Sequence, residues 1–147
     1  MTVLRDAVPD LRVELEARSD PGRAPAMAAY MKDHFVFLGV TSTDRKLAAK
    51  AFTATAKIAS SDELLDAAAV LWAQPEREFQ YVACDLLRRW VRHLDETSIG
   101  AIDRLIRSKS WWDTIDSLAP NTVGPLVRGH PELVALMDAW IDDEDFW

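Results

Sequence analysis

Apolar residues recur every three or four positions along most of the chain, which is the spacing of one face of a helix. Polar or helix-breaking stretches separate these runs, the clearest being the linker Ser19–Pro25 and the pair Pro120–Asn121. The chain has five glycines and few β-branched runs, which disfavours a sheet protein. The pattern predicts helices at residues 4–15, 25–35, 43–58, 60–72, 75–94, 97–106, 110–119, 123–127 and 131–141.

Several of the predicted helices begin at residues suited to capping. Thr43 is expected to cap the third helix, and Ser60 forms a capping box with Glu63 at the start of the fourth. Ser110 is a natural N-cap, with Asp113 three residues later, where a carboxylate suits the positive end of the helix dipole. Asp113 therefore has an expected structural role.

The number and rhythm of the helices indicate the fold class. At 147 residues the chain is long enough for one domain with a sizeable core. Pairs of short helices, repeating roughly every thirty-odd residues, predict an all-α HEAT-like helical-repeat superhelix, an α–α solenoid, over a single domain 1–147. A four-helix bundle is the alternative, which the larger number of short helices disfavours.

Charge narrows the classes of partner without deciding between them. The formal net charge is −7, which is unusual for a protein that binds nucleic acid along its whole surface. The signs are segregated, because acids dominate residues 138–145 and bases dominate residues 88–109. A local basic face can therefore still contact phosphate. The bases of that segment are Arg88, Arg89, Arg92, Arg104, Arg107 and Lys109.

Other features predict a cytoplasmic monomer without a cofactor. Cys84 is the single cysteine and fits a reducing compartment. The charged N-terminus does not resemble a signal peptide, and no apolar run approaches the ~20 residues of a membrane span. The three histidines, His34, His93 and His130, lack the spacing of metal ligands, so no metal is expected. Phosphate-binding loops and serine-nucleophile motifs are also missing from the sequence.

Trp112 and Asp116 are four residues apart and should project together from one helix face. Adjacent tryptophans usually fill a core, and Trp111 fits that interpretation because it shares a stripe with Ile115 and Leu118. Trp112 and Asp116 fit it less well, because a buried aspartate must be paired. An exposed carboxylate one turn past an indole indicates a site for a cationic partner.

Three stretches of the sequence resemble the DNA alkylation repair family of HEAT-like DNA glycosylases, the AlkD type. They are Tyr30–Val40, Trp72–Gln80 and Lys109–Asp116, and His130–Leu133 gives weaker support. The resemblance implies an all-α superhelix that holds double-stranded DNA along its concave face. It also implies hydrolysis of the N-glycosidic bond of alkylated purines such as 3-methyladenine and 7-methylguanine.

The resemblance assigns roles to individual residues. Asp116 matches the family's catalytic carboxylate, and Trp112 and Tyr30 match aromatic residues of its cleft. Family members continue with helices that supply an arginine and a further tryptophan, which nothing here matches. The chain is therefore expected to be the N-terminal part of a longer glycosylase domain, and to excise bases weakly or not at all by itself.

The chemistry of the reaction suits these residues. An N-alkylated base is already cationic and leaves readily, so the enzyme mainly has to stabilise an oxocarbenium-like sugar, as a fixed carboxylate does. Arg104, Arg107 and Lys109 are the candidate phosphate contacts. The alternative is a noncatalytic helical-repeat module that binds DNA or protein, with Trp112 and Asp116 buried for structure. The solvent exposure of Asp116 distinguishes the two.

Overall fold

The computed structural model describes residues 3–54 and 56–147, and in that part of the chain all regular structure is helical. None of its helices is both long and apolar enough to cross a membrane. The α-helices are α1 (Val8–Glu16), α2 (Ala24–Tyr30), α3 (Ser42–Thr53), α4 (Ser61–Trp72), α5 (Arg77–Arg89), α6 (Ile99–Arg107), α7 (Trp112–Leu118), α8 (Gly124–Gly129) and α9 (Val134–Ile141). Shorter turns are η1 (Leu4–Ala7), η2 (Val91–His93), η3 (Glu96–Ser98), the π-helical η4 (Ala119–Val123) and η5 (Pro131–Leu133).

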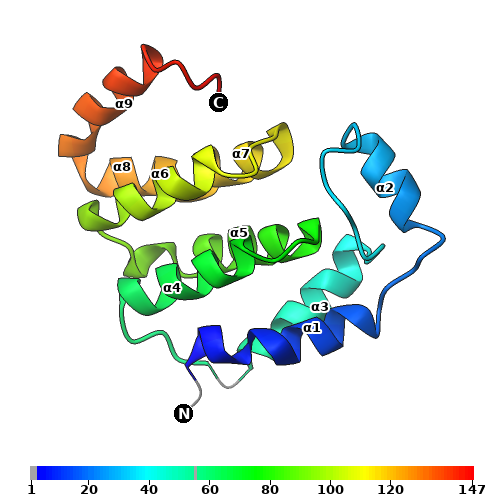
Figure 1. The fold of residues 1–147 in the computed structure, drawn as a ribbon. Helices are drawn as coiled ribbons and strands as arrows, with labels where there is room; N and C mark the ends of the chain where they lie inside the picture. Colours follow the sequence, from blue (N-terminus) through cyan, green and yellow to red (C-terminus); the bar gives the residue numbers. More distant parts are fainter. Residues whose placement is uncertain (1–2, 55) are drawn as a thin grey trace.

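The helices pair and stack in two layers (Figure 1). Helix α1 packs against α3, α4 against α5, and α6 against α7. Within the second layer α3 contacts α5, and α5 contacts α7, so each pair touches mainly its neighbours. This is the arrangement of a helical repeat rather than of a bundle around one axis. The predicted all-α, HEAT-like class is confirmed.

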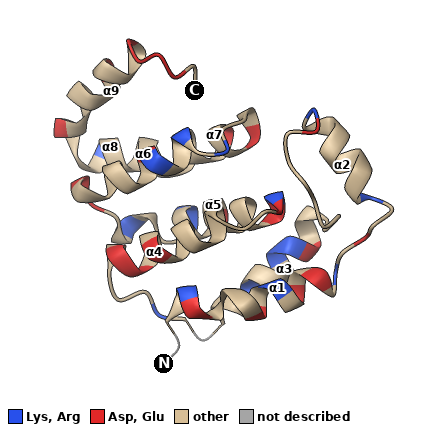
Figure 2. Cartoon of the chain, in the orientation of Figure 1, with Lys and Arg blue, Asp and Glu red and all other residues tan. Residues whose placement is uncertain are grey.

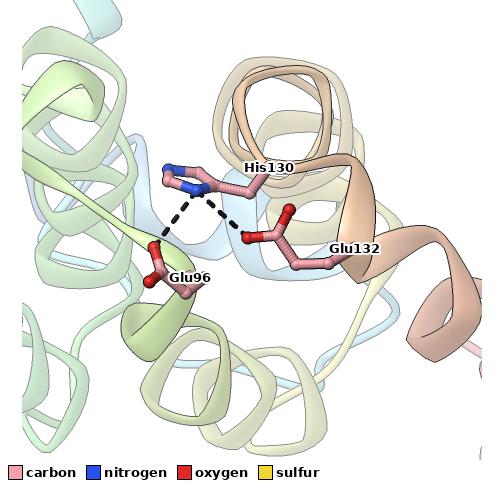
Figure 3. A group of neighbouring side chains, drawn as sticks. All are labelled: Glu96, His130 and Glu132. Atoms are coloured by element: carbon pink, nitrogen blue, oxygen red, sulfur yellow. Dashed lines mark ion pairs between the residues drawn. The ribbon is translucent and has the colours of Figure 1, made fainter.

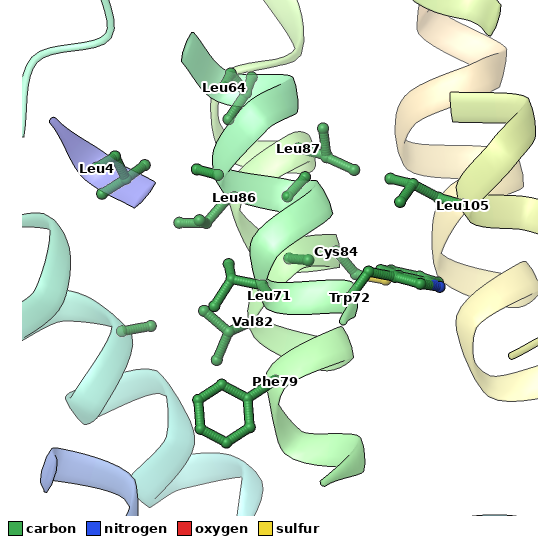
Figure 4. Close-up of a cluster of buried hydrophobic side chains, with 14 of the residues drawn as sticks. Leu4, Leu64, Leu71, Trp72, Phe79, Val82, Cys84, Leu86, Leu87 and Leu105 are labelled. Atoms are coloured by element: carbon green, nitrogen blue, oxygen red, sulfur yellow. The ribbon is translucent and has the colours of Figure 1, made fainter. Parts of the chain in front are cut away.

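The core is centred on the pair α4 and α5, the most extensive helix contact in the molecule. Leu71 of α4 lies on the same side as Val82 and Phe79 of α5, and Trp72 points to the other side, beside Cys84 (Figure 4). All of these side chains are buried. Each such side chain contributes about 1.5–3 kcal/mol through removal of its surface from water. Cys84 belongs to the same core, and burial raises the pKa of its thiol to about 12. It is therefore a neutral packing residue.

The structure changes one of the two predicted N-cap residues of α3 and α4 and keeps the other. The side chain of Thr41, not Thr43, caps α3 by accepting a hydrogen bond from the Asp44 N–H. Ser60 caps α4 as predicted, accepting from the Glu63 N–H at 3.2 Å. The Glu63 carboxylate reaches one residue further back than a standard capping box, to the Ala59 N–H.

Three predicted helices are shorter than the apolar pattern suggests. The helix predicted at 43–58 ends at Thr53. The helix predicted at 25–35 ends at Tyr30, because Lys32 and Asp33 have φ values of 57° and 58° and turn the chain back. The helix predicted at 75–94 spans Arg77 to Arg89, and the remainder forms the separate turn η2. In each case apolar side chains continue past the helix end, so the stripe does not mark the boundary.

Candidate functional site

Helix α7 carries the two residues that the sequence singles out. Trp111 holds the N-cap position in an extended conformation, so the prediction that Ser110 caps this helix is wrong. The Ser110 hydroxyl instead donates back to the Ile106 carbonyl of α6. Lys109, with a φ of 54°, makes the sharp turn that lets α7 start next to α6. The tight connection fixes the direction in which α7 presents its exposed face.

That exposed face contains both Trp112 and Asp116. Trp112 is 38% exposed, which is high for an indole, and Asp116 is exposed one turn later. Within residues 3–54 and 56–147 the Asp116 carboxylate has neither an ion pair nor a side-chain hydrogen bond. A carboxylate that serves the fold would be paired or buried. Asp116 is therefore available to a ligand.

Tyr30 reaches the same place from a distant part of the sequence. Its ring meets the Trp112 ring edge to face, with the centroids 5.9 Å apart, and Tyr30 is 70% exposed. In the turn after α2, His34 stacks on Trp111 with a centroid distance of 4.1 Å. Helix α2 lies beside the start of α7 in Figure 1. The structure thus brings Tyr30, Trp112 and the helix of Asp116 together on one exposed surface, here called the aromatic–carboxylate surface.

The connector Val36–Val40 holds α2 in this position. Gly39 has a φ of 84°, and a Cβ there would lie 2.1 Å from the Asp20 carbonyl oxygen, so only glycine fits. The Glu78 carboxylate, fully buried at the start of α5, accepts hydrogen bonds from the N–H groups of Leu38, Gly39 and Val40 at 2.9–3.2 Å. The connector is therefore fastened to the core rather than loose.

Asp113 has a larger structural role than capping. Arg77, which is 0% exposed, donates from Nε and Nη2 to its two carboxylate oxygens at 2.9 and 2.5 Å. The Tyr81 hydroxyl donates to the same carboxylate at 2.6 Å. Burial by itself raises the pKa of Asp113, but the hydrogen bonds from Arg77 and Tyr81 outweigh it and hold that pKa below its usual range. Asp113 stays ionised and belongs to the core.

The three predicted phosphate contacts differ in their surroundings. Arg107 donates two hydrogen bonds to Asp143 and one to Asp103, all of 3.1 Å or less. The Lys109 ammonium donates to the Trp72 and Gln74 carbonyls at the end of α4. Arg104 is exposed and has no acidic partner among the described residues. Of the three, only Arg104 makes no side-chain hydrogen bond within the described residues, and the assignment of all three to phosphate stays a prediction.

A second group of bases lies in the α3–α5–α7 layer. Lys46 and Lys50 of α3, with Arg89 of α5, line a shallow cavity of about 160 Å³. Arg89 donates to the Thr53 hydroxyl, and neither lysine has an acidic partner in the described part of the chain. Sequence reasoning misses the two lysines because α3 is far from the basic segment 88–109 in the chain. We name Lys46, Lys50 and Arg89 the basic groove.

The acidic residues after α9 are partly neutralised by the fold. Figure 2 shows this tail as a red segment. Its Asp143 pairs with Arg107 of α6, and this hydrogen bonding lowers the pKa of Asp143 to about 2. Trp147 packs on Trp111 with a centroid distance of 5.6 Å. The tail therefore lies against α6 and α7.

One group of side chains has the composition of a metal site. Glu96 of η3 and Glu132 of η5 both approach Nδ1 of His130, at 3.1 and 3.5 Å (Figure 3). The three ligand atoms lie within 4.8 Å of one another, but both glutamates are exposed. Two carboxylates directed at one imidazole nitrogen are the geometry of an ion pair that joins two turns. The chain spacing of the histidines could not reveal this contact.

A family model and a solved structure that match this chain are both described as DNA alkylation repair enzymes. The sequence model of a family described as DNA alkylation repair enzyme matches residues 11–147. The solved structure of a predicted DNA alkylation repair enzyme from Enterococcus faecalis superposes with a TM-score of 0.77 at 28% sequence identity. The match covers 88% of this chain and 61% of that one, so the chain spans less than two thirds of the length of that structure. A search of curated proteins finds no significant match.

Proposed function

The chain belongs to the DNA alkylation repair family, and from this premise we propose that it acts on alkylated DNA as a glycosylase. The substrates would be N-alkylated purines such as 3-methyladenine and 7-methylguanine in double-stranded DNA. The observation that carries the proposal is the exposed, unpaired carboxylate of Asp116, one turn from Trp112, whose ring packs against that of Tyr30.

In this proposal Asp116 stabilises the positive charge that develops on the sugar. When the bond from C1′ to the base nitrogen breaks, its electron pair neutralises the cationic base, and the sugar takes on oxocarbenium character. A carboxylate close to C1′ stabilises that charge and can accept a proton from the attacking water. The products are the free base and an abasic site. An exposed Asp116 without an internal partner suits this role, because no competing cation neutralises it.

Trp112 and Tyr30 would contact the damaged nucleotide. The face of an indole or phenol ring attracts a cation by about 0.5–2 kcal/mol, so an alkylated base or a cationic sugar favours such a surface over an ordinary nucleotide. The edge-to-face packing of the two rings fixes the angle between them. A rigid aromatic corner can therefore hold the nucleotide close to Asp116.

Phosphate contacts would come from exposed bases without internal partners. Lys46 and Lys50 of the basic groove satisfy this condition, and so does Arg104. Arg107 and Lys109 are already hydrogen-bonded within the chain, so recruiting either one would break existing hydrogen bonds. We therefore rank Lys46, Lys50 and Arg104 before Arg107 and Lys109 as phosphate ligands.

The proposal is tested by base release from a duplex with a single 7-methylguanine. Protein in excess over DNA measures the single-turnover rate, and the same duplex without protein gives the spontaneous loss. We expect slow release that still exceeds the spontaneous rate, because the chain spans only part of the length of its structural relative. Asp116→Asn should release the base at the spontaneous rate. Asp138→Asn, which changes an exposed acid of α9, is the matched control and should behave like the parent chain.

Two other outcomes would contradict the proposal. Binding to abasic duplex without release above the spontaneous rate would favour the noncatalytic module that binds DNA. Equal release by Asp116→Asn and the parent chain would show that the reaction does not depend on this carboxylate.

A further inference from the structure

One buried cation connects the two separate parts of the aromatic–carboxylate surface. We propose that Arg77 is the positioning residue of this surface, because its guanidinium fixes both the start of α7 and the segment that follows Tyr30. The proposal rests on the function proposed above for Asp116. Arg77 touches no part of the exposed surface itself, so it acts through the elements that it holds.

Toward α7, the Arg77 guanidinium uses nearly all of its donors. Besides the two hydrogen bonds to Asp113, Nη1 donates to the Lys109 carbonyl at 2.8 Å and Nη2 to the Thr114 hydroxyl at 3.3 Å. Asp113 and Thr114 lie in the first turn of α7, directly after Trp112 and before Asp116. The direction of that turn sets where Trp112 and Asp116 point.

Toward α2, the same guanidinium stacks on the ring of Phe35, with its carbon 3.5 Å from the ring centroid. The backbone N–H of Arg77 donates to the Val36 carbonyl at 2.9 Å. Glu78, the next residue, holds the connector through its carboxylate. Two successive residues at the start of α5 therefore fasten the chain that returns from Tyr30.

A planar cation suits this junction better than an apolar side chain would. A buried ion pair by itself gives little net stability, because removing the charges from water costs about as much as their attraction returns. An arginine fork bonds a carboxylate at two points and stacks on a ring, so it fixes orientation as well as distance. A reacting group displaced by about 1 Å can lose on the order of 10² in rate.

Arg12 provides a matched control within the same chain. It donates to both carboxylate oxygens of Glu76 at 2.9 Å and lies over the ring of Phe79 at 4.5 Å. Arg12 thus has the same two types of interaction at the start of α5. It bonds neither α7 nor the connector, so its replacement should affect stability without moving the aromatic–carboxylate surface.

The experiment compares Arg77→Lys and Arg12→Lys in the 147-residue chain labelled with 5-fluorotryptophan. Fluorine NMR reports the environment of Trp112, whose resonance is assigned from Trp112→Phe, and single-turnover release of 7-methylguanine is measured on the same samples. We expect Arg77→Lys to shift the Trp112 resonance and to lower the rate per folded molecule by about 10- to 100-fold. Arg12→Lys should change neither, even where its melting temperature falls.

The remaining outcomes are also decisive. An unmoved Trp112 resonance in folded Arg77→Lys would overturn the positioning role, whatever the rate. A shifted resonance in a chain whose parent releases no base would support positioning and contradict the proposed function alone. If Arg77→Lys does not fold, Tyr81→Phe removes only the hydroxyl bonded to Asp113 and should shift the same resonance in a folded chain. No shift in that variant would overturn the proposal.

Discussion

The two faces of α7 present two aspartates in opposite surroundings. Asp113 borders the buried face of Thr114 and Leu118, and its side chain is 5% exposed and pairs with Arg77. Asp116, less than one turn later, is exposed and has no partner among the described residues. The two residues are chemically identical, so the difference between them comes entirely from position. One carboxylate serves the fold, and the other is left free for a ligand.

This contrast shows how a helical repeat can leave a carboxylate exposed with little cost in stability. The buried face of α7 supplies the orientation, through hydrogen bonds that hold its first turn. The face opposite Thr114 and Leu118 presents Trp112 and Asp116 to solvent. Substitutions on the two faces should therefore have separable consequences.

The largest expected effect is on the buried face. Asp113→Asn would leave the Arg77 cation buried without a counter-charge, and breaking such a pair costs about 3–5 kcal/mol. We expect this decrease in the free energy of unfolding, measured by urea denaturation. A decrease below about 1 kcal/mol, typical of an exposed pair, would contradict the contrast between the two faces.

A second prediction concerns phosphate binding by the basic groove. Lys46→Glu with Lys50→Glu should weaken binding to an abasic duplex and flatten its salt dependence, with the slope of log K against log salt falling by about 0.9 for each phosphate that the protein no longer neutralises. Arg104→Glu with Arg107→Glu should weaken binding less, because Arg107 already pairs with Asp143. The reverse order would show that the segment around α6 is the principal phosphate surface.

A third prediction uses pH to separate the aspartates. The pKa of Asp113 is held below its unfolded value, so its contribution to stability is present above the unfolded pKa, near ~4, and disappears as pH falls through the folded value. In Asp113→Asn, the free energy of unfolding should therefore decrease less as the pH falls than it does in the unchanged chain. Urea midpoints between about pH 5 and pH 2 test this, and parallel curves for parent and variant would contradict it.

The smallest effect is expected at the exposed ion pair of the acidic tail. Asp143 accepts two hydrogen bonds from the Arg107 guanidinium, as Asp113 does from Arg77, but in contact with water. Exposed pairs contribute little because solvent and salt screen them. Asp143→Asn should leave the melting temperature unchanged within error. A drop as large as that of Asp113→Asn would show that geometry matters more than burial.

The sequence predicts the fold class and the exposed face of α7 well, because both depend on local spacing. The helix-period pattern gives the number of helices, and the interval from Trp112 to Asp116 places both on one face. The sequence pattern is less accurate about where helices end and about which apolar residues face the core. In α3, for example, Ala48 and Phe52 pack inward and the larger Leu47 is 50% exposed.

Contacts between distant segments could not be predicted from spacing. The Arg77–Asp113 pair joins residues 36 positions apart, and nothing local marks Arg77 as buried. For the same reason the sequence pattern does not reveal Lys46 and Lys50, and it predicts Arg107 as a free base although Asp143 binds it. Charges show their partners only after the helices stack.

The central claim is that Asp116 stabilises the positive charge of the reacting sugar and contributes little to the stability of the fold. The direct measurement is the single-turnover rate of 7-methylguanine release by the parent chain and Asp116→Asn, with the free energy of unfolding determined on the same samples. We predict that the rate falls to that of spontaneous release, a loss of up to about 10²–10³, with the free energy of unfolding changed by less than about 0.5 kcal/mol. An unchanged rate per folded molecule together with a clear decrease in stability would contradict the claim.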